Sequence, residues 1–193
     1  MTRRAQVARG PKPPRPVVLL GVGAGIAAFK AAALASQLVQ KGCAVHVLMT
    51  PDAAKFVAPL TFAGLTGHAV VHESTAMAGG HAAHIALAEA ASCFVVAPAT
   101  ADLIARLAAG QADDAVTLTA LCCTAPRIFC PAMNDRMWNH AFTRRNAATL
   151  VAAGWQQLGP DTGHLAEGYA AVGRMVEPEA ILRAVLKVVA RGA

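Results

Sequence analysis

The chain has 193 residues and a mass of 19.8 kDa, which predicts one domain with enough residues to bury a core. Hydrophobic residues make up 55% of the sequence and charged residues 15%, a balance that excludes intrinsic disorder as the state of the whole chain. Aromatic residues are only 5%, and alanine, valine and leucine dominate the apolar content. This composition favours helices packed on a buried sheet over an all-β domain.

The formal charge of +6 is concentrated at the start of the sequence. Five basic residues and no acidic one occur among the first fifteen: Arg3, Arg4, Arg9, Lys12 and Arg15. Elsewhere 12 basic and 11 acidic residues nearly cancel, so we expect no nucleic-acid partner. We predict that residues 1–16 form a disordered arm, with an organelle address or a site for an anionic partner as the alternative. No secretory signal core and no run of about 20 apolar residues is present, which predicts a soluble, cytoplasmic protein.

The cysteines and most of the histidines show no spacing typical of a disulfide framework or a metal site. We expect the five cysteines to be small, mostly buried apolar residues in a reducing compartment: Cys43, Cys93, Cys122, Cys123 and Cys130. Six histidines are expected to face solvent or to be satisfied locally, and no metal is predicted: His46, His68, His72, His81, His140 and His164.

Short apolar runs alternate with helical patterns along the chain. The predicted strands are residues 17–20, 44–49, 93–97 and 127–130, with 154–158 as a candidate last strand. The predicted helices are residues 26–41, 52–66, 84–91, 100–109, 113–123, 140–153 and 178–190. This alternation predicts a single α/β domain over residues 17–193, a Rossmann-like (flavodoxin-like), doubly wound parallel sheet in three layers. The glycine-rich residues 159–175 are predicted to form a long functional loop.

A glycine turn, Gly21 to Gly25, lies between the first strand and the first helix. Such a turn lets backbone N–H groups approach a phosphate, although a plain tight turn is the alternative. The dinucleotide fingerprint would need a small residue at Ile26, and the second strand is followed by Thr50 rather than by an acid. Thr50 therefore offers a hydroxyl to a mononucleotide phosphate.

Polar residues follow the third and fourth strands as well. After Pro98, which we expect to end its strand, Thr100 or Asp102 can cap the next helix. Asn134, in the run PAMNDRMW, offers a donor and an acceptor, and capping is equally natural for it. Because the carboxyl ends of parallel strands meet at one edge, these junctions predict one site. His84 begins a predicted helix, where it is a capping or surface residue or, since imidazole exchanges protons near neutral pH, a catalytic one.

The segments GVGAGIAAFKA, HIALAEAA, VVAPATAD, QADD, PAMNDRMW and GHLAEGYAAVGRM, in this order, resemble the flavin-containing cysteine decarboxylases. That family includes phosphopantothenoylcysteine decarboxylases of coenzyme A synthesis and peptidyl-cysteine decarboxylases of lanthipeptide pathways. The resemblance covers residues 17–185. It implies FMN as the cofactor, with FAD as the alternative. It also implies homotrimers, often assembled into dodecamers, with the flavin at subunit interfaces.

The resemblance also assigns residues to roles. It makes His84 and Asn134 catalytic, with Asn134 holding the substrate carboxylate. The residues expected to contact substrate are Met133, Asn134, Met137, Glu167 and Arg174. Those expected to contact the flavin are Ala24, Gly25, Ile26, Thr50, Phe56, Pro98, Thr100, Ala101, Asp102, Leu103 and Ala132.

Three positions depart from the family pattern. Gly23-Ala24-Gly25 replaces Thr-Gly-Ser, which shifts phosphate binding to backbone amides, and Ala101-Asp102-Leu103 places a charge near the flavin. The family's loop motif Leu-Ala-Cys-Gly, whose cysteine donates a proton in phosphopantothenoylcysteine decarboxylases, has Glu167 at the cysteine position.

Glu167 lacks the redox chemistry of a thiol, so we expect the reaction to stop at the enethiol. The predicted function is therefore oxidative decarboxylation of the C-terminal cysteine of a ribosomally synthesised precursor peptide to an aminoenethiol. The first alternative is phosphopantothenoylcysteine decarboxylase of coenzyme A synthesis. The second is a non-enzymatic flavin-binding regulatory subunit, and a prenyl-flavin-forming relative is the weakest candidate.

Overall fold

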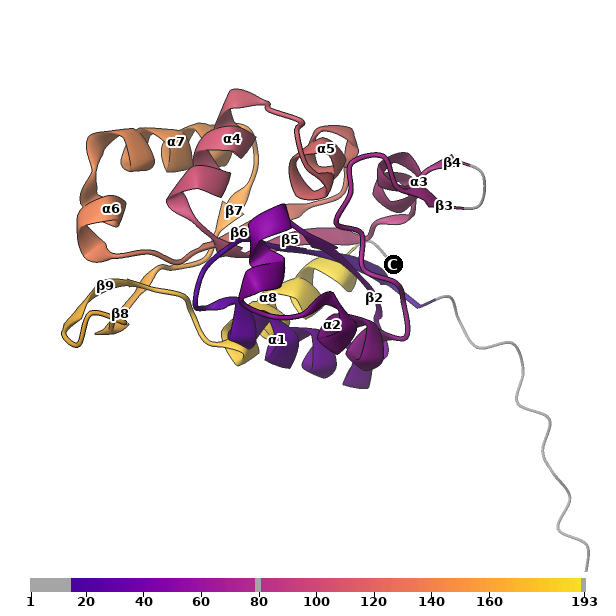
Figure 1. The fold of residues 1–193 in the computed structure, drawn as a ribbon, viewed down its shortest axis with the longest axis horizontal. Coiled ribbons are helices and arrows are strands. Elements are labelled where there is room, and N and C mark those ends of the chain that lie inside the picture. Colours follow the sequence, from indigo (N-terminus) through magenta and orange to yellow (C-terminus); the bar gives the residue numbers. More distant parts are fainter. Residues whose placement is uncertain (1–14, 79–80, 192–193) are drawn as a thin grey trace, which may run out of the picture.

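The computed structural model describes residues 15–78 and 81–191, which are arranged around a parallel sheet (Figure 1). The sheet has five strands in the order β2-β1-β5-β6-β7. Their bounds are β1 Val17–Val22, β2 Ala44–Met49, β5 Cys93–Ala99, β6 Arg127–Pro131 and β7 Gln156–Gln157. Because the chain adds β2 on one side of β1 and β5 on the other, the strand order reverses between β1 and β5. Ligands of doubly wound sheets bind beyond the carboxyl ends of the strands at this reversal.

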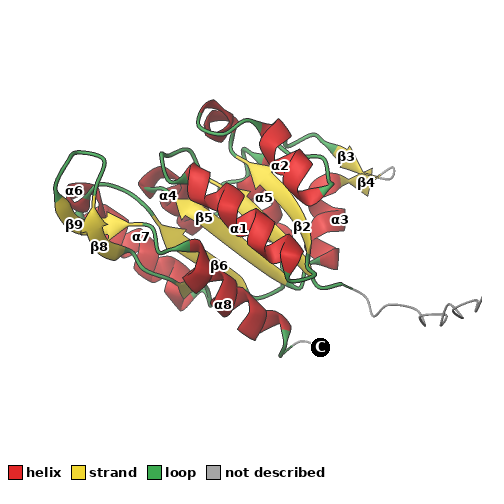
Figure 2. Cartoon of the chain, turned by 90° about the horizontal axis from the view of Figure 1, so that it is seen from below, coloured by secondary structure: helices red, strands yellow, loops and turns green. Residues whose placement is uncertain are grey.

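Helices cover both faces of the sheet (Figures 1 and 2). One layer holds α1 (Ala28–Gln40) and α8 (Pro178–Val189). The opposite layer holds α3 (Ala83–Ala90), α4 (Ala101–Ala109), α5 (Ala115–Cys122) and α7 (Ala141–Ala152). Shorter elements are η1 Pro51–Lys55, α2 Pro59–Thr66, β3 Met77–Ala78, β4 His81–Ala82 and α6 Asp135–Asn139. The predicted three-layer, doubly wound α/β fold is confirmed.

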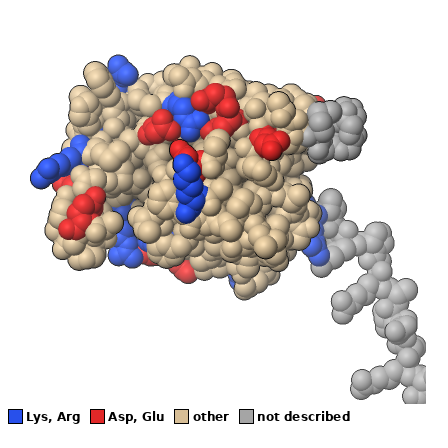
Figure 3. Space-filling model, viewed as in Figure 1, with Lys and Arg blue, Asp and Glu red and all other residues tan. Residues whose placement is uncertain are grey.

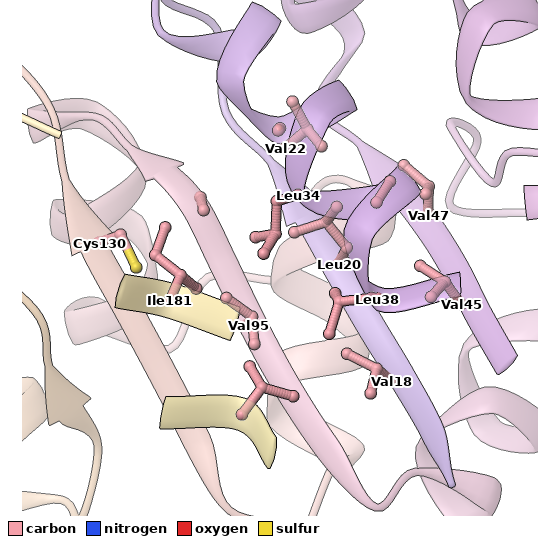
Figure 4. Close-up of a cluster of buried hydrophobic side chains, with 14 of the residues drawn as sticks. Val18, Leu20, Val22, Leu34, Leu38, Val45, Val47, Val95, Cys130 and Ile181 are labelled. Carbon is pink, nitrogen blue, oxygen red and sulfur yellow. The ribbon is translucent and has the colours of Figure 1, made fainter. Parts of the chain in front are cut away.

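Alternate residues of each central strand enter different halves of the core. Val18, Leu20 and Val95 pack with α1 and α8 (Figure 4). Leu19 and Phe94 point to the opposite face and pack with the other helical layer. All seven residues of β5 are buried, as expected for the central strand of a covered parallel sheet. The continuous apolar runs of the sequence follow from this burial on both faces.

Two predicted elements differ in detail. The helix expected over residues 52–66 is divided into η1 and α2, and Pro59 is the first residue of α2. Proline favours an extended residue before it, and Ala58 has ψ 138°, which separates the two helices. Pro98 does not end its strand: β5 continues to Ala99, with an irregular register against β6 between Val96 and Ala99.

The predicted long loop at residues 159–175 is instead mainly an antiparallel hairpin. Its strands are β8 (Asp161–His164) and β9 (Ala170–Arg174). Most of their residues are exposed, so they lack the alternation of apolar and polar residues that identifies a half-buried strand. In Figure 1 the hairpin lies beside α6, at the end of the sheet that carries the predicted ligand site.

The predicted arm lies outside the described residues, apart from Arg15 and Pro16. Over the face drawn in Figure 3, basic side chains stand singly or beside acidic ones and form no continuous basic surface. Across residues 15–78 and 81–191, no helix has the length and apolar character needed to cross a membrane.

Candidate flavin and substrate site

A cleft of about 730 Å³ opens beyond the carboxyl ends of β1, β5 and β6, and the β8–β9 hairpin forms part of its wall. Seven predicted flavin residues line it: Ala24, Gly25, Ile26, Thr100, Ala101, Asp102 and Ala132. All five predicted substrate residues line it too: Met133, Asn134, Met137, Glu167 and Arg174. Thr50, Phe56, Pro98, Leu103 and His84 are not part of the lining. Residues from five separate segments are thus brought together at the edge that the strand ends predicted.

The glycine turn packs closely against β5. The Gly23 N–H donates to the Pro98 carbonyl at 3.1 Å, and a Cβ at Gly23 would stand 2.5 Å from that oxygen. No hydrogen bond within the described residues uses the backbone N–H groups of Ala24, Gly25 or Ile26. The helix α1 that follows has no side-chain cap and no acidic residue in its first turn. Free N–H groups in a turn that leads into a helix are suited to an anion such as a phosphate.

Thr50 lies beside this turn. Its backbone N–H donates to the Val22 carbonyl at 3.1 Å, and its side chain is almost fully buried. The Thr50 hydroxyl has no partner in the described part of the chain. A buried hydroxyl without a partner is costly unless a ligand satisfies it. The free N–H groups and the orphaned hydroxyl together fit the phosphate of a flavin mononucleotide.

The segment that follows β5 supplies a helix cap and a charged side chain. The Thr100 hydroxyl accepts a hydrogen bond from the Leu103 N–H at 3.2 Å, so Thr100 is the cap of α4. Asp102 lines the cleft and pairs with Arg106 at 3.0 Å. Arg106 also pairs with Asp113, and this guanidinium holds the pKa of the Asp113 carboxyl below its ordinary value. The charge that Asp102 brings to the cleft is therefore partly balanced.

Asn134 begins α6 and faces the hairpin. Its Oδ1 accepts a hydrogen bond from the Arg136 N–H at 2.9 Å, which confirms the capping role. Its Nδ2 donates to the Tyr169 hydroxyl at 3.0 Å, and that hydroxyl donates to Asp135 at 2.6 Å. One residue before Asn134, the Met133 N–H donates to the Gly173 carbonyl at 3.0 Å. Asn134 is thus held between α6 and the hairpin.

Sequence reasoning missed several lining residues: Phe29, Lys30, Asp52, His164, Leu165, Ala166 and Met175. Lys30 is the most informative of them because it is a buried cation. Its Nζ donates to the Met175 carbonyl at 3.1 Å and pairs with Glu177 at 3.0 Å. The signal was present in the sequence, since Lys30 is a lone charge within the alanine-rich first helix.

His84 is the second residue of α3, which lies at the opposite end of the molecule from the β8–β9 hairpin (Figure 1). Its Nδ1 is buried and has no partner in the described residues. Phe56, another predicted site residue outside the lining, exposes half of its side chain just after η1. Like Thr50, Pro98 and Leu103, these two residues lie outside the lining of the cleft. The roles of all the predicted site residues remain predictions.

The other histidines and the cysteines form no candidate metal group within residues 15–78 and 81–191. His46 and His68 stack with ring centroids 4.1 Å apart, and the His81 side chain lies outside the described part. Four cysteines are buried, whereas Cys122 is partly exposed. Burial raises the pKa of the Cys93 thiol to about 12.

Curated relatives include two bifunctional proteins of coenzyme A biosynthesis, both called CoaBC. The protein of Bacillus subtilis is 45% identical over 167 residues, which cover 86% of this chain and 41% of the relative. The protein of Mycobacterium bovis is 43% identical over 164 residues, 85% of this chain and 39% of the relative. The chain thus spans about two fifths of the length of these relatives. Their similarity contradicts the prediction of a peptide-modifying enzyme and favours the coenzyme A alternative.

Solved structures agree on the fold and the chemistry of the family. The FMN-dependent cysteine decarboxylase SpaF has a TM-score of 0.77 and 30% identity, covering 90% of this chain and 97% of that one. A mutant PPC (phosphopantothenoylcysteine) decarboxylase complexed with pantothenoylaminoethenethiol has a TM-score of 0.81 and 28% identity, covering 90% and 98%. The predicted FMN cofactor is confirmed by these relatives and by the flavoprotein family model, which matches residues 8–190. The chain therefore belongs to the flavoprotein family.

Proposed function

We propose that the protein decarboxylates phosphopantothenoylcysteine in an FMN-dependent reaction of coenzyme A biosynthesis. The observation that carries this proposal is the 45% identity to a coenzyme A biosynthesis protein, which extends over 86% of the chain. The likeness to a PPC decarboxylase, at a TM-score of 0.81, supports the same substrate. A cleft that holds Asn134 and the phosphate-binding turn together supports a flavin reaction at this site.

The chain's own residues divide the work of binding. The N–H groups of Ala24, Gly25 and Ile26 and the Thr50 hydroxyl hold the FMN phosphate. When bound, FMN accepts the electrons of thiol oxidation, so that the resulting thioaldehyde can take up the electron pair left by carbon dioxide. The free N–H of the Asn134 amide binds the substrate carboxylate and orients it for departure.

Glu167 is the residue we assign to the last proton transfer. It lines the cleft from the hairpin tip, and none of the five cysteines of the chain lies in that hairpin. Its carboxyl group donates a proton to the carbon that carried the carboxylate, which converts the enethiolate into a thioaldehyde. The two electrons that FMN would have taken up in thiol oxidation would then return to this thioaldehyde, which gives the saturated thiol. This role reconciles a coenzyme A enzyme with the absence of the family's loop cysteine.

His84 is assigned to the proton that leaves the substrate thiol, in a site shared with a second copy of the chain. It does not line the cleft of its own chain, and its Nδ1 is buried and unpartnered in the described residues. Ile26 and Phe29, which line the cleft, expose 67% and 60% of their side chains. Apolar exposure at the rim of a polar site is typical of a surface that another subunit covers.

The test is incubation of the FMN-loaded protein with phosphopantothenoylcysteine, followed by mass spectrometry of the product. We expect loss of carbon dioxide alone. Glu167→Gln should instead release the enethiol, which has lost carbon dioxide and two hydrogens, and Asn134→Asp should abolish turnover. Asn139→Asp, an exposed position on the same helix, is the matched control. Enethiol as the main product of the unaltered protein, or no product, would overturn the proposal.

A further inference from the structure

Tyr169, the single tyrosine of the chain, connects the tip of the β8–β9 hairpin to the start of α6. Its hydroxyl lies 3.0 Å from Asn134 Nδ2 and 2.6 Å from Asp135 Oδ1. Tyr169 does not itself line the cleft, whereas Asn134 does. The tyrosine therefore stands behind a residue that faces the substrate.

The direction of each hydrogen bond in this series follows from which groups can donate and which can only accept. The Arg136 N–H can only donate, so the Asn134 atom facing it is the amide oxygen. The amide nitrogen consequently faces Tyr169. The Asp135 carboxylate can only accept, so the tyrosine hydroxyl donates to Asp135 and accepts from Asn134. Both ends of the Asn134 amide are thus held, and one N–H of its nitrogen remains for a ligand.

The same contact determines where the hairpin tip lies. The base of the hairpin is joined to the rest of the chain by the Gly173 carbonyl, which accepts from the Met133 N–H. The tip, residues 165–169, carries Glu167. Among the hydrogen bonds of residues 15–78 and 81–191, those of the Tyr169 side chain connect this tip to α6. Loss of the hydroxyl would remove these links between the tip and α6 and would free one side of the Asn134 amide, while the buried Leu165 still anchors part of the tip.

We propose that Tyr169 is a positioning residue of the decarboxylase, which orients the Asn134 amide toward the substrate carboxylate and holds Glu167 against the same cleft. This role rests on the proposed function, because it assigns the carboxylate of that substrate to Asn134. It adds to that function a residue that contacts neither the substrate nor the flavin.

The bond itself can be tested without any turnover. Tyrosine labelled with ¹³C at Cζ gives one resonance, since the chain has one tyrosine, and FMN in the holoenzyme contributes none. The hydrogen bond to Asp135 raises the pKa of Tyr169 above 10.0, so we expect this resonance to titrate above that pH. Asp135→Asn should bring the titration back toward 10.0. If the resonance titrates at the same pH in the unaltered protein and in Asp135→Asn, the hydrogen bond between Tyr169 and Asp135 is contradicted.

The functional arm compares Tyr169→Phe with Thr162→Val, an exposed hydroxyl lost from the same hairpin. The loss of one oriented hydrogen bond should raise KM about 3- to 10-fold in Tyr169→Phe with a smaller change in kcat, and the Thr162 variant should match the unaltered protein. An unchanged KM would overturn the positioning role. If the unaltered protein fails to turn over phosphopantothenoylcysteine, the proposed function fails and this role with it, while the titration still reports on the bond.

Discussion

The buried hydroxyl of Thr50 destabilises the FMN-free protein, and a ligand that hydrogen-bonds to it can offset that loss of stability. A buried polar group without a partner destabilises a fold by about 1–3 kcal/mol, whereas a hydrogen bond to a charged group contributes about 1.5–3 kcal/mol. If it binds the FMN phosphate as proposed, the same hydroxyl is unfavourable without the anion and favourable with it. The adjacent glycine turn has N–H groups without partners among the described residues, which supports the proposal that both bind the same phosphate.

Thr50→Val should separate these two effects, since valine keeps the shape and removes the hydroxyl. We expect FMN affinity to fall about 10-fold or more, while the stability of the FMN-free protein stays level or rises. Fluorescence titration with FMN and denaturant unfolding measure the two quantities. The control is Thr119→Val, which removes a buried hydroxyl that donates to the Ala115 carbonyl at 2.7 Å, away from the cleft. We expect this variant to be less stable and to bind FMN as tightly as the unaltered protein. Unchanged FMN affinity in Thr50→Val would refute the phosphate role.

The placement of candidate site residues was predictable from sequence where a strand end determined it. Thr50, Thr100 and Asn134 each follow a buried strand, and parallel strands bring such residues to one edge. Tyr169 could not be found in this way, because its partners Asn134 and Asp135 lie more than thirty positions earlier and no local pattern relates them. His84 is predicted as a site residue by resemblance, yet it does not line the cleft of its own chain, because tertiary packing that no motif encodes places it elsewhere.

At the scale of elements, the position of the hairpin depends on one glycine, because any larger residue there would push the hairpin away from Met133. Gly173 has φ +142°, and a Cβ there would stand 2.2 Å from the Met133 carbonyl oxygen. Met133 precedes Asn134, so this contact aligns β9 with the residue that we propose binds the substrate carboxylate. The hairpin escaped prediction because its strands are short, exposed and interrupted by glycine, and therefore show no period of two.

Gly173→Ala should destabilise the protein by about 3 kcal/mol or more and weaken substrate binding, because the hairpin must move away from Met133. Gly168→Ala is a matched control from the same hairpin. Gly168 also has a positive φ, +89°, but a Cβ there would contact nothing within 4 Å, so we expect a loss of only about 1 kcal/mol. Denaturant unfolding of both variants measures the difference, and equal losses would contradict the close-contact argument.

For the whole molecule, Lys30 and Glu177 connect distant parts of the chain. Lys30 lies on α1 and Glu177 immediately precedes α8, so their 3.0 Å contact joins residues 147 positions apart. The Lys30 side chain is only 10% exposed, whereas that of Glu177 is 48% exposed. Lys30, with Arg174, lowers the pKa of Glu177 below 4.5. As the pH falls, the Glu177 carboxylate therefore becomes protonated at a higher pH in the unfolded chain than in the folded protein.

Stability from the Lys30–Glu177 pair should be complete above pH 4.5 and should be lost as the pH falls through the lower folded-state pKa. Glu177→Gln should be less stable than the unaltered protein by about 1–2 kcal/mol at pH 7, since it leaves a buried cation with one partner. The difference should narrow in strong acid. Urea unfolding at neutral pH and in acid measures it, with Glu89→Gln at an exposed position of α3 as the control. A difference that is equal at both pH values would exclude the ionic contribution.

The buried cysteines have a consequence for a protein whose proposed substrate is itself a thiol. Thiol–disulfide exchange requires a thiolate, and burial keeps the proton on Cys93 and Cys130 by raising the pKa of both. Cys43 and Cys123 are buried as well. A fold that buries these four thiols in its core can handle a reactive thiol in an oxidising cofactor site without forming mixed disulfides through them.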